Sequence, residues 1–156
     1  MSKRIGMTCK LEPQESQQPY TFNGVSANDV SHLAASMLDA FRDTEDFEGE
    51  TLEGLGVEIR DVIESKFGMF ISDASFQICQ NAEIASAILI SLYEGKPLVS
   101  ELFTRKKYMN LGMARSLLRK SINVLLTLGY EDLILYVHPK NAQAIKLYKK
   151  IGFIEL

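Results

Sequence analysis

The stretch LYVHPKNAQAIKLYKKIGF, residues 135–153, changes its hydrophobic period midway and predicts a strand followed by a helix. Its first residues belong to the apolar run EDLILYVH (131–138), which is typical of a strand. From about Asn141 to Lys150 apolar residues recur at helical spacing, and Gly152 supplies a C-terminal stop. The apolar stripe of this helix consists of Ala144, Leu147, Tyr148 and Ile151.

A second helix with a glycine at its entry lies upstream of that strand. The stretch YMNLGMARSLL (108–118) leads into a helix expected from about Gly112 to Leu128, which Gly129 ends. Because the strand PLVSELFT (97–104) precedes this helix and EDLILYVH follows it, the three form a β–α–β unit with parallel strands and a right-handed crossover. The N-terminus of the helix then points at whatever lies beside the sheet.

The remaining elements lie nearer the N-terminus. Strands are expected at KRIGMTCKL (3–11), SFQICQ (75–80) and EIASAILISLY (83–93), and the last is apolar nearly throughout and therefore central. Ser26 and Thr51 can each cap a helix. The order β, α, α, β, β, β, α, β, α, β predicts an α/β fold in which about four helices flank a mixed, mostly antiparallel central sheet.

The composition fits a single soluble domain over residues 1–156. The chain is 46% hydrophobic and 24% charged, as ordinary globular proteins are. Its longest apolar run, IASAILISL (84–92), is far shorter than the roughly 20 residues of a membrane span. No apolar segment follows the charged start of the chain, so no secretory signal is expected. Cys9 and Cys79 lack a metal-binding spacing and are expected to be small buried residues. We expect a cytoplasmic protein without a metal site.

Charge is distributed unevenly along the chain. Residues 1–101 carry a balance of −10 and residues 102–156 one of +7, within a net charge of −3. This asymmetry favours two unlike ligands, although segregated solvated faces explain it equally well. Nucleic acid is not expected as a partner, because no aromatic-basic interleaving or known binding motif accompanies the basic third.

The loop RKKYMNLGMA (105–114) has two interpretations. Its glycine and the helix start after it can form a cradle for a diphosphate, with basic residues on both sides. Alternatively, Gly112 only serves helix packing. One glycine and one alanine, taken alone, favour the packing explanation.

Residues 135–153 resemble the C-terminal part of the GNAT N-acetyltransferase superfamily, which transfers an acyl group from acyl-coenzyme A to an amine. The matching positions are Val137, Asn141, Ala144, Leu147, Tyr148, Gly152 and Phe153. The family's Gln/Arg-x-x-Gly-x-Gly/Ala loop falls on Met109, Gly112 and Ala114, and the element order matches over essentially the whole chain. The resemblance therefore implies the GNAT fold, acetyl-CoA as cofactor and an amine as acceptor, and it reverses the preference for a packing glycine.

The resemblance also assigns cofactor-binding residues. The pyrophosphate would be held by the loop and the first helical residues, namely Met109, Asn110, Leu111, Gly112, Met113, Ala114 and Arg115. The pantetheine arm would pair like an extra strand with Leu102, Phe103 and Thr104. Asn141 would contact the cofactor from the start of the last helix. Charge and position make Lys146 a candidate for the outer phosphates, together with Arg105, Lys106 and Lys107.

Tyr148 would be the catalytic acid that protonates the leaving thiolate. Phenol has a pKa near 10 and a thiol near 8.5, so this proton transfer is not strongly uphill. Without the resemblance, Tyr148 reads as an aromatic packing residue on its helix.

The sequence departs from the family pattern at three places. Met109 stands where arginine or glutamine is usual, and Leu111 stands where a polar or basic residue is usual. Backbone amides can still bind the phosphates, but a side-chain contact is lost. Only Ile-Glu-Leu follows Phe153, so either the sequence is short, or the acceptor site is open, or another subunit completes it. The unfinished sheet edge is compatible with a homodimer.

Amine attack requires a group that accepts a proton. Glu101, in the strand beside the expected acetyl site, is the first candidate, and His138 is the second. The acidic connection RDTEDFEGE (42–50) between the first two helices can attract a cationic amine such as a polyamine, an aminoglycoside or a lysine side chain. The alternative is a solvated acidic loop.

Two functions remain open at this point. The first is an N-acetyltransferase that moves acetyl from acetyl-CoA to a primary amine of a small molecule or protein by direct transfer in a ternary complex. The second is a non-catalytic acyl-CoA-binding sensor or regulatory module. Tyr148 and Asn141 favour the first function, whereas Met109 and the short C-terminal end favour the second. The residues leave the identity of the acceptor open.

Overall fold

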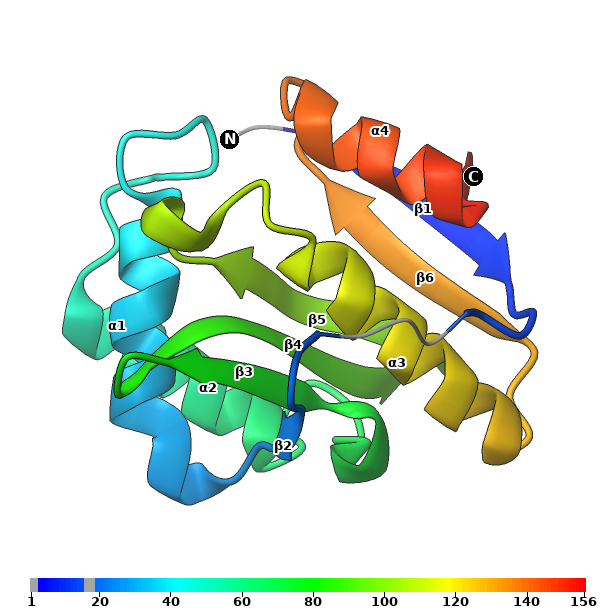
Figure 1. Ribbon diagram of the computed structural model, residues 1–156, viewed down its shortest axis with the longest axis horizontal. Helices are drawn as coiled ribbons and strands as arrows, with labels where there is room; N and C mark the ends of the chain where they lie inside the picture. Colours follow the sequence, from blue (N-terminus) through cyan, green and yellow to red (C-terminus); the bar gives the residue numbers. More distant parts are fainter. Residues whose placement is uncertain (1–2, 16–18) are drawn as a thin grey trace.

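The computed structural model describes residues 3–15 and 19–156, whose strands form one sheet in the order β2-β3-β4-β5-β6-β1-β7 (Figure 1). The strands are β1 (Ile5–Lys10), β2 (Asn23–Gly24), β3 (Phe76–Gln80), β4 (Glu83–Tyr93), β5 (Lys96–Thr104), β6 (Asp132–Val137) and β7 (Ile154–Glu155). The pair β5–β6 is parallel and the other pairs are antiparallel. The predicted mixed, mostly antiparallel sheet is confirmed.

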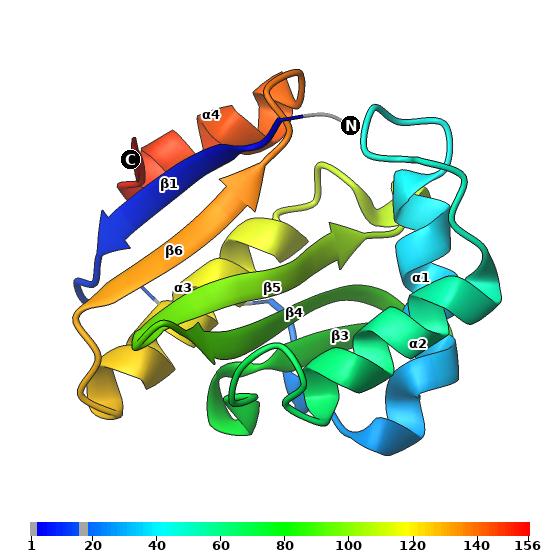
Figure 2. The same cartoon turned by 180° about the vertical axis from the view of Figure 1, so that it is seen from behind.

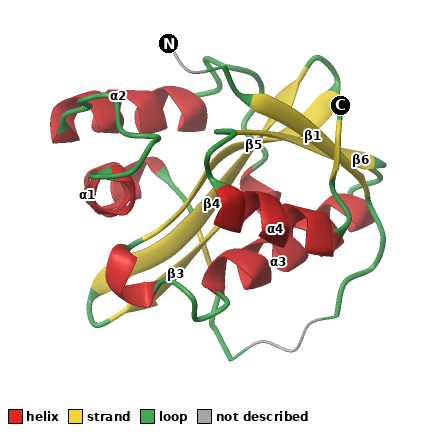
Figure 3. Cartoon of the chain, turned by 90° about the horizontal axis from the view of Figure 1, so that it is seen from above, coloured by secondary structure: helices red, strands yellow, loops and turns green. Residues whose placement is uncertain are grey.

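Helices cover both faces of this sheet. They are α1 (Val30–Phe41), α2 (Leu52–Ile63), α3 (Met113–Thr127) and α4 (Ala142–Ile151). Figure 3 shows α1 and α2 on one side of the sheet and α3 and α4 on the other. None of the helices in the described ranges is long and apolar enough to cross a membrane.

The predicted helix caps are present. Ser26 and Asp29 form a capping box around the short 3-10 turn that leads into α1. The hydroxyl of Thr51 accepts a hydrogen bond from the Gly54 amide, 3.0 Å away, at the start of α2. Leu52 and Leu128 are exposed, because one is the first residue of α2 and the other follows the last residue of α3.

The sheet separates two hydrophobic cores. One lies between the sheet and α3, and its fully buried members include Met7, Ile88, Leu117 and Phe153. The other lies under α1 and α2 and includes Leu33, Ile59 and Leu89. Strand β4 is buried from Ile84 to Ser91, as predicted for a strand covered on both faces. Cys9 is buried, but Cys79 is exposed, because the β3–β4 register shifts between Ile78 and Cys79.

Strands β5 and β6 separate after a short parallel contact. Leu98 of β5 pairs with Ile134 of β6, and beyond this pair the two strands diverge, as Figures 1 and 2 show. A bulge contributes to this bend, because Leu89 of β4 pairs with Glu101 while Ile90 pairs with Val99. The last residues of β5 therefore offer unpaired backbone groups on the side that faces β6.

Candidate active site

A cavity of about 790 Å³ opens where β5 and β6 diverge. It is bounded by the C-terminal end of α1 and the loop after it, by the end of β5, by the start of α3 and by α4. Its lining includes Phe41, Thr44, Glu45, Asp46, Leu102, Phe103, Thr104, Tyr108, Met109, Asn110, Gly112, Met113, Ala114, Arg115, Lys140, Asn141, Gln143, Leu147 and Tyr148. Most of the site residues predicted from the sequence thus meet in one space.

The start of α3 forms one end of the cavity. Gly112 has φ +81° and contributes no side-chain cap, so the N–H groups of Met113, Ala114 and Arg115 have no partner in the described part of the chain. Asn110 also has positive φ, at 65°, which turns the loop sharply before the helix. A Cβ atom at Gly112 would lie 3.3 Å from the Arg115 guanidinium. These amides and the helix dipole are suited to an anion.

Distant parts of the chain hold this loop in place. The hydroxyl of Tyr20 donates a hydrogen bond to the Leu111 carbonyl. The hydroxyl of buried Tyr108 donates to Glu83 at 2.9 Å and accepts from Asn81 at 3.0 Å. The Gln143 amide donates to the Asn110 side chain from α4. The sequence did not point to Tyr20, Tyr108 or Gln143, because their contacts join residues far apart in the chain.

Three of the basic residues predicted near the phosphates bind other parts of the protein. The guanidinium of Arg105 donates to the Ser36 hydroxyl and the Ile84 carbonyl, both at 3.0 Å. The Lys106 amine donates to the backbone carbonyls of Asp39 and Arg42 at the end of α1. Lys107 forms an ion pair with Glu83. These contacts hold the loop against α1 and β4 rather than leaving its charges available to a ligand.

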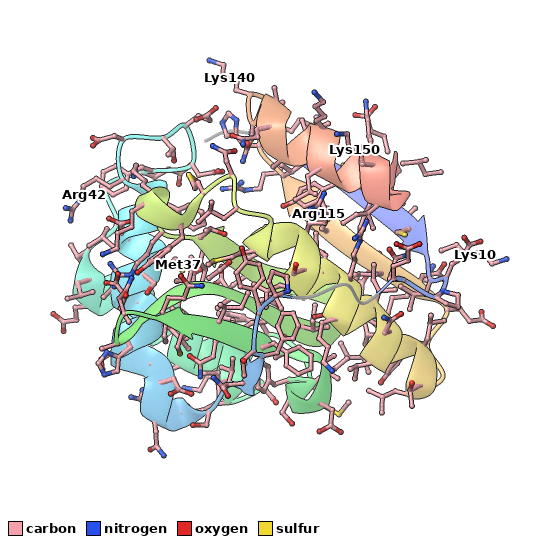
Figure 4. The ribbon with its side chains drawn as sticks, viewed as in Figure 1. Lys10, Met37, Arg42, Arg115, Lys140 and Lys150 are labelled. Atoms are coloured by element: carbon pink, nitrogen blue, oxygen red, sulfur yellow. The ribbon has the colours of Figure 1, made fainter. Side chains whose placement is uncertain are left out.

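Two other basic residues occupy different surroundings. Arg115 lines the cavity, and Figure 4 shows it at the N-terminal end of α3. Lys146 instead lines a separate hollow on α4 together with Lys149 and Lys150. Leu111, which is 54% exposed, is also outside the cavity lining. The predicted cofactor residues outside the lining are therefore Arg105, Lys106, Lys107, Leu111 and Lys146.

Tyr148 lines the cavity from α4 and packs edge-on against Phe153, with ring centroids 5.8 Å apart. Burial raises the pKa of the Tyr148 hydroxyl to about 12, and the nearby Asp46 carboxylate adds to the increase. The hydroxyl is therefore protonated at neutral pH. This pKa is higher than the ordinary phenol value near 10, at which proton transfer to a thiolate is not strongly uphill.

Asn141 stands at the junction of β6 and α4. It is the N-cap of α4, and its side-chain oxygen accepts a hydrogen bond from the Ala144 amide at 3.2 Å. Because Asn141 also lines the cavity, the same residue starts the helix and contributes to the site.

Glu101 lies on the opposite face of the sheet from α3. Its cross-strand partner Leu89 and its neighbour Phe103 belong to the core under α1 and α2. Glu101 is only 8% exposed and is not among the lining residues of the cavity. Burial raises its pKa well above the usual range, and Glu58 adds to the increase through a hydrogen bond and its charge, whereas Arg4 opposes it.

His138, the second candidate base, is buried and is likewise outside the lining of the cavity. Its Nδ1 accepts a hydrogen bond from the Lys140 amide at 3.1 Å, which stabilises the turn into α4. His138 therefore has a structural role at that turn.

The fold and the cavity together define the class of protein. A model of the acetyltransferase (GNAT) family matches residues 37–153. The chain therefore belongs to the GNAT acetyltransferase family, whose members use acetyl-CoA. Comparison with curated protein sequences gives no match.

Solved structures confirm the fold. The chain superposes on a GCN5-related N-acetyltransferase from Sphaerobacter thermophilus with a TM-score of 0.75 and 16% identity, covering 100% of this chain and 50% of that one. It also matches the PaiA N-acetyltransferase from Thermoplasma acidophilum in complex with coenzyme A (TM-score 0.68, 17% identity, 86% and 89% covered). The ribosomal-protein-S18-alanine N-acetyltransferase from Escherichia coli gives a TM-score of 0.66 at 20% identity, with 85% and 76% covered. The chain spans 50% to 60% of the length of the larger relatives.

Proposed function

We propose that this protein is an acetyl-CoA-dependent N-acetyltransferase that transfers acetyl directly to a primary amine in a ternary complex. The observation that carries this proposal is one cavity that joins the unpaired amides at the start of α3 to the Tyr148 hydroxyl. An anion-binding end and a proton donor in one space are the two features that acyl transfer from a phosphate-bearing thioester needs.

The residues present fit coenzyme A. The amides of Met113, Ala114 and Arg115 would hold the pyrophosphate, and the missing side chain of Gly112 leaves room for its approach. The free edge of β5 from Leu102 to Thr104 would hydrogen-bond the pantetheine arm. The bound cofactor would supply the acetyl group as an activated thioester. A relative with the same fold binds coenzyme A, which supports this assignment.

The transfer has a simple balance of bonds and protons. The neutral amine nitrogen forms a bond to the acetyl carbon, the carbon–sulfur bond breaks, the nitrogen loses one proton and the sulfur gains one. Tyr148 would give its hydroxyl proton to the sulfur and recover one afterwards. A phenol with a pKa of about 12 donates uphill to an ordinary thiolate, but the same partly dry surroundings also raise the pKa of a thiol held beside it.

Removal of the amine proton would proceed through water. Glu101 stays the candidate for the final proton acceptor, since burial raises its pKa and so makes its carboxylate a stronger base. Because Glu101 does not line the cavity, a water would have to connect it with the amine.

The alternative function is an acyl-CoA-binding sensor without catalysis. The high pKa of Tyr148 and the use of Arg105, Lys106 and Lys107 within the protein favour it, since both weaken the case for fast turnover. Met109, 41% exposed at the cavity, likewise provides no charge to a phosphate.

A thermal-shift titration with acetyl-CoA followed by a thiol-release assay over a panel of primary amines separates these functions. The enzyme proposal expects a rise in melting temperature and amine-dependent release of thiol. A thermal shift without release by any amine supports the sensor, and the absence of a shift at saturating acetyl-CoA contradicts both.

A further inference from the structure

An ion pair joins two separate elements beside the cavity. Arg4, directly before β1, donates a hydrogen bond to the Asp46 carboxylate at 2.8 Å, although 42 positions separate the two residues. Asp46 belongs to the loop between α1 and α2, and this loop and the beginning of β1 both lie at the top of Figures 1 and 2. The side chain of Asp46 is 15% exposed and that of Arg4 is 42% exposed, so the pair lies at the protein surface rather than within a core.

The ion pair leaves a second carboxyl group of the same loop facing the cavity. Glu45, the residue before Asp46, lines the cavity as Asp46 does. Arg4 is hydrogen-bonded to Asp46 alone of these two residues. Two carboxyl groups of one loop therefore face the space that an acceptor enters, and this favours binding of a further positive charge.

Asp46 is the member of this group that reaches the reacting end of the cavity. It lines the cavity together with Tyr148, and its charge contributes to the raised pKa of the Tyr148 hydroxyl. A positive group bound to Asp46 therefore lies close to the point at which a proton is donated to the leaving group. Arg4 provides a positive group next to Asp46, at a distance of 2.8 Å.

We propose that the Arg4–Asp46 pair determines acceptor specificity, and that the acceptor is a primary amine carrying a second ammonium group a few bonds away. This second ammonium would bind Asp46 in place of Arg4 while the first amine receives the acetyl group. The proposal rests on the proposed acetyltransferase function. A monoamine of equal length makes no such contact, and an amine with a carboxylate in that position is repelled by Asp46.

The test compares three acceptors of equal chain length: 1,4-diaminobutane, 1-aminobutane and 4-aminobutanoate. Steady-state thiol release with saturating acetyl-CoA gives kcat and KM for each. We expect the wild-type protein to prefer the diamine over the monoamine by about tenfold in kcat/KM, the effect of one partly screened ion pair. Asp46→Asn should remove this preference through KM, and Arg4→Gln should lower the KM for the diamine because it removes the internal competitor.

Matched variants control for a general change of charge. Glu48→Gln removes a negative charge from the same loop at a position outside the cavity lining, and Arg42→Gln removes a positive charge that Figure 4 shows pointing away from the protein body. Neither should change the ratio between diamine and monoamine. Equal preference for the three acceptors, a preference for 4-aminobutanoate, or a higher diamine KM in Arg4→Gln would overturn the proposal.

A binding measurement separates failure of this inference from failure of the proposed function. If no amine releases thiol, the enzyme proposal fails, but 1,4-diaminobutane should still raise the melting temperature of the wild-type protein with coenzyme A and leave that of Asp46→Asn unchanged. If the diamine shifts neither protein, or both equally, the Asp46 site fails irrespective of catalysis.

Discussion

The two ends of the cavity are built by different means. The end at α3 presents backbone amides, and the positive side chains just before it, from Arg105 to Lys107, bind other parts of the protein. The end near Tyr148 presents side chains from separate elements, with Asp46 from a loop and Arg4 from the approach to β1. Backbone amides bind a phosphate irrespective of most side chains, whereas the side-chain end depends on individual residues.

This difference explains why the departures at Met109 and Leu111 leave the cradle intact. Both residues are substantially exposed, and neither changes the left-handed turn at Gly112 or the start of α3. The acceptor end has no comparable backbone element. A change of one carboxylate there alters the charge that a substrate meets, so we expect acceptor specificity to depend on that end.

The largest effect is expected at the side-chain end. Tyr148→Phe keeps the ring that packs on Phe153 but removes the proton donor, and should lower kcat by about a hundredfold, a typical contribution of general acid catalysis. The dissociation constant of acetyl-CoA from isothermal titration should stay within about twofold. Tyr136→Phe, on a tyrosine that is 51% exposed and outside the cavity lining, is the control and should change neither quantity. Unchanged turnover in Tyr148→Phe would mean that Tyr148 serves packing and not proton donation.

The second effect tests the backbone end. Gly112→Ala places a Cβ atom 3.3 Å from the Arg115 guanidinium in a left-handed conformation, and should raise the dissociation constant of acetyl-CoA by about tenfold. Gly129→Ala has similar backbone strain, at φ +94°, but adds its Cβ atom to open space. Both variants should melt at lower temperature, and only the first should bind the cofactor more weakly. Equal affinities in the two would show that the cradle tolerates a side chain.

A smaller effect distinguishes Arg115, which lines the cavity, from Lys107, which forms an ion pair within the protein. Arg115→Met removes a charge that lines the cavity and should weaken acetyl-CoA binding about threefold to fivefold, more at low salt than at high salt. Lys107→Met removes a charge already paired with Glu83 and should change affinity by less than about twofold. Titrations at two salt concentrations measure both. A stronger loss in Lys107→Met than in Arg115→Met would reverse the assignment of these residues.

The smallest effect concerns stability at the buried carboxyl group of Glu101. Because folding raises the pKa of Glu101 above its ordinary value of 4.5, the folded state binds more protons than the unfolded state above that pH. The contribution of Glu101 to the free energy of unfolding is therefore highest below pH 4.5 and is lost as the pH rises through the raised pKa. Glu101→Gln does not titrate, so its stability relative to wild type should increase by about 1 kcal/mol or more between pH 4.5 and pH 8.

Urea denaturation at the two pH values measures this difference. Glu155→Gln, which removes an exposed carboxylate from β7, is the matched control and should show the same difference from wild type at both. A gain in Glu101→Gln that does not depend on pH would mean that Glu101 is ionised in the folded protein.

Much of the fold was accessible from hydrophobic period and capping residues. The strand β4, the capping residues Ser26 and Thr51, and the helix stop at Gly152 all act through neighbours a few positions away. One short strand differs: β2 was not predicted, because two residues carry no periodic signal and β2 exists only by pairing with β3. Exposed Cys79 was wrongly assigned to the interior, since the register shift beside it is a property of the strand pair.

The sequence alone determined the order of the longer elements, the family resemblance and the glycine at the entry to α3, because each depends on residues close together in the chain. Only the tertiary structure decided how the charges are used. It placed Arg105, Lys106 and Lys107 against α1 and Glu83, moved Lys146 to a separate hollow, buried Glu101 beside Glu58, and brought Arg4 to Asp46. Charged side chains are long and their partners can come from any element, so their pairing follows from the packed structure rather than from local pattern.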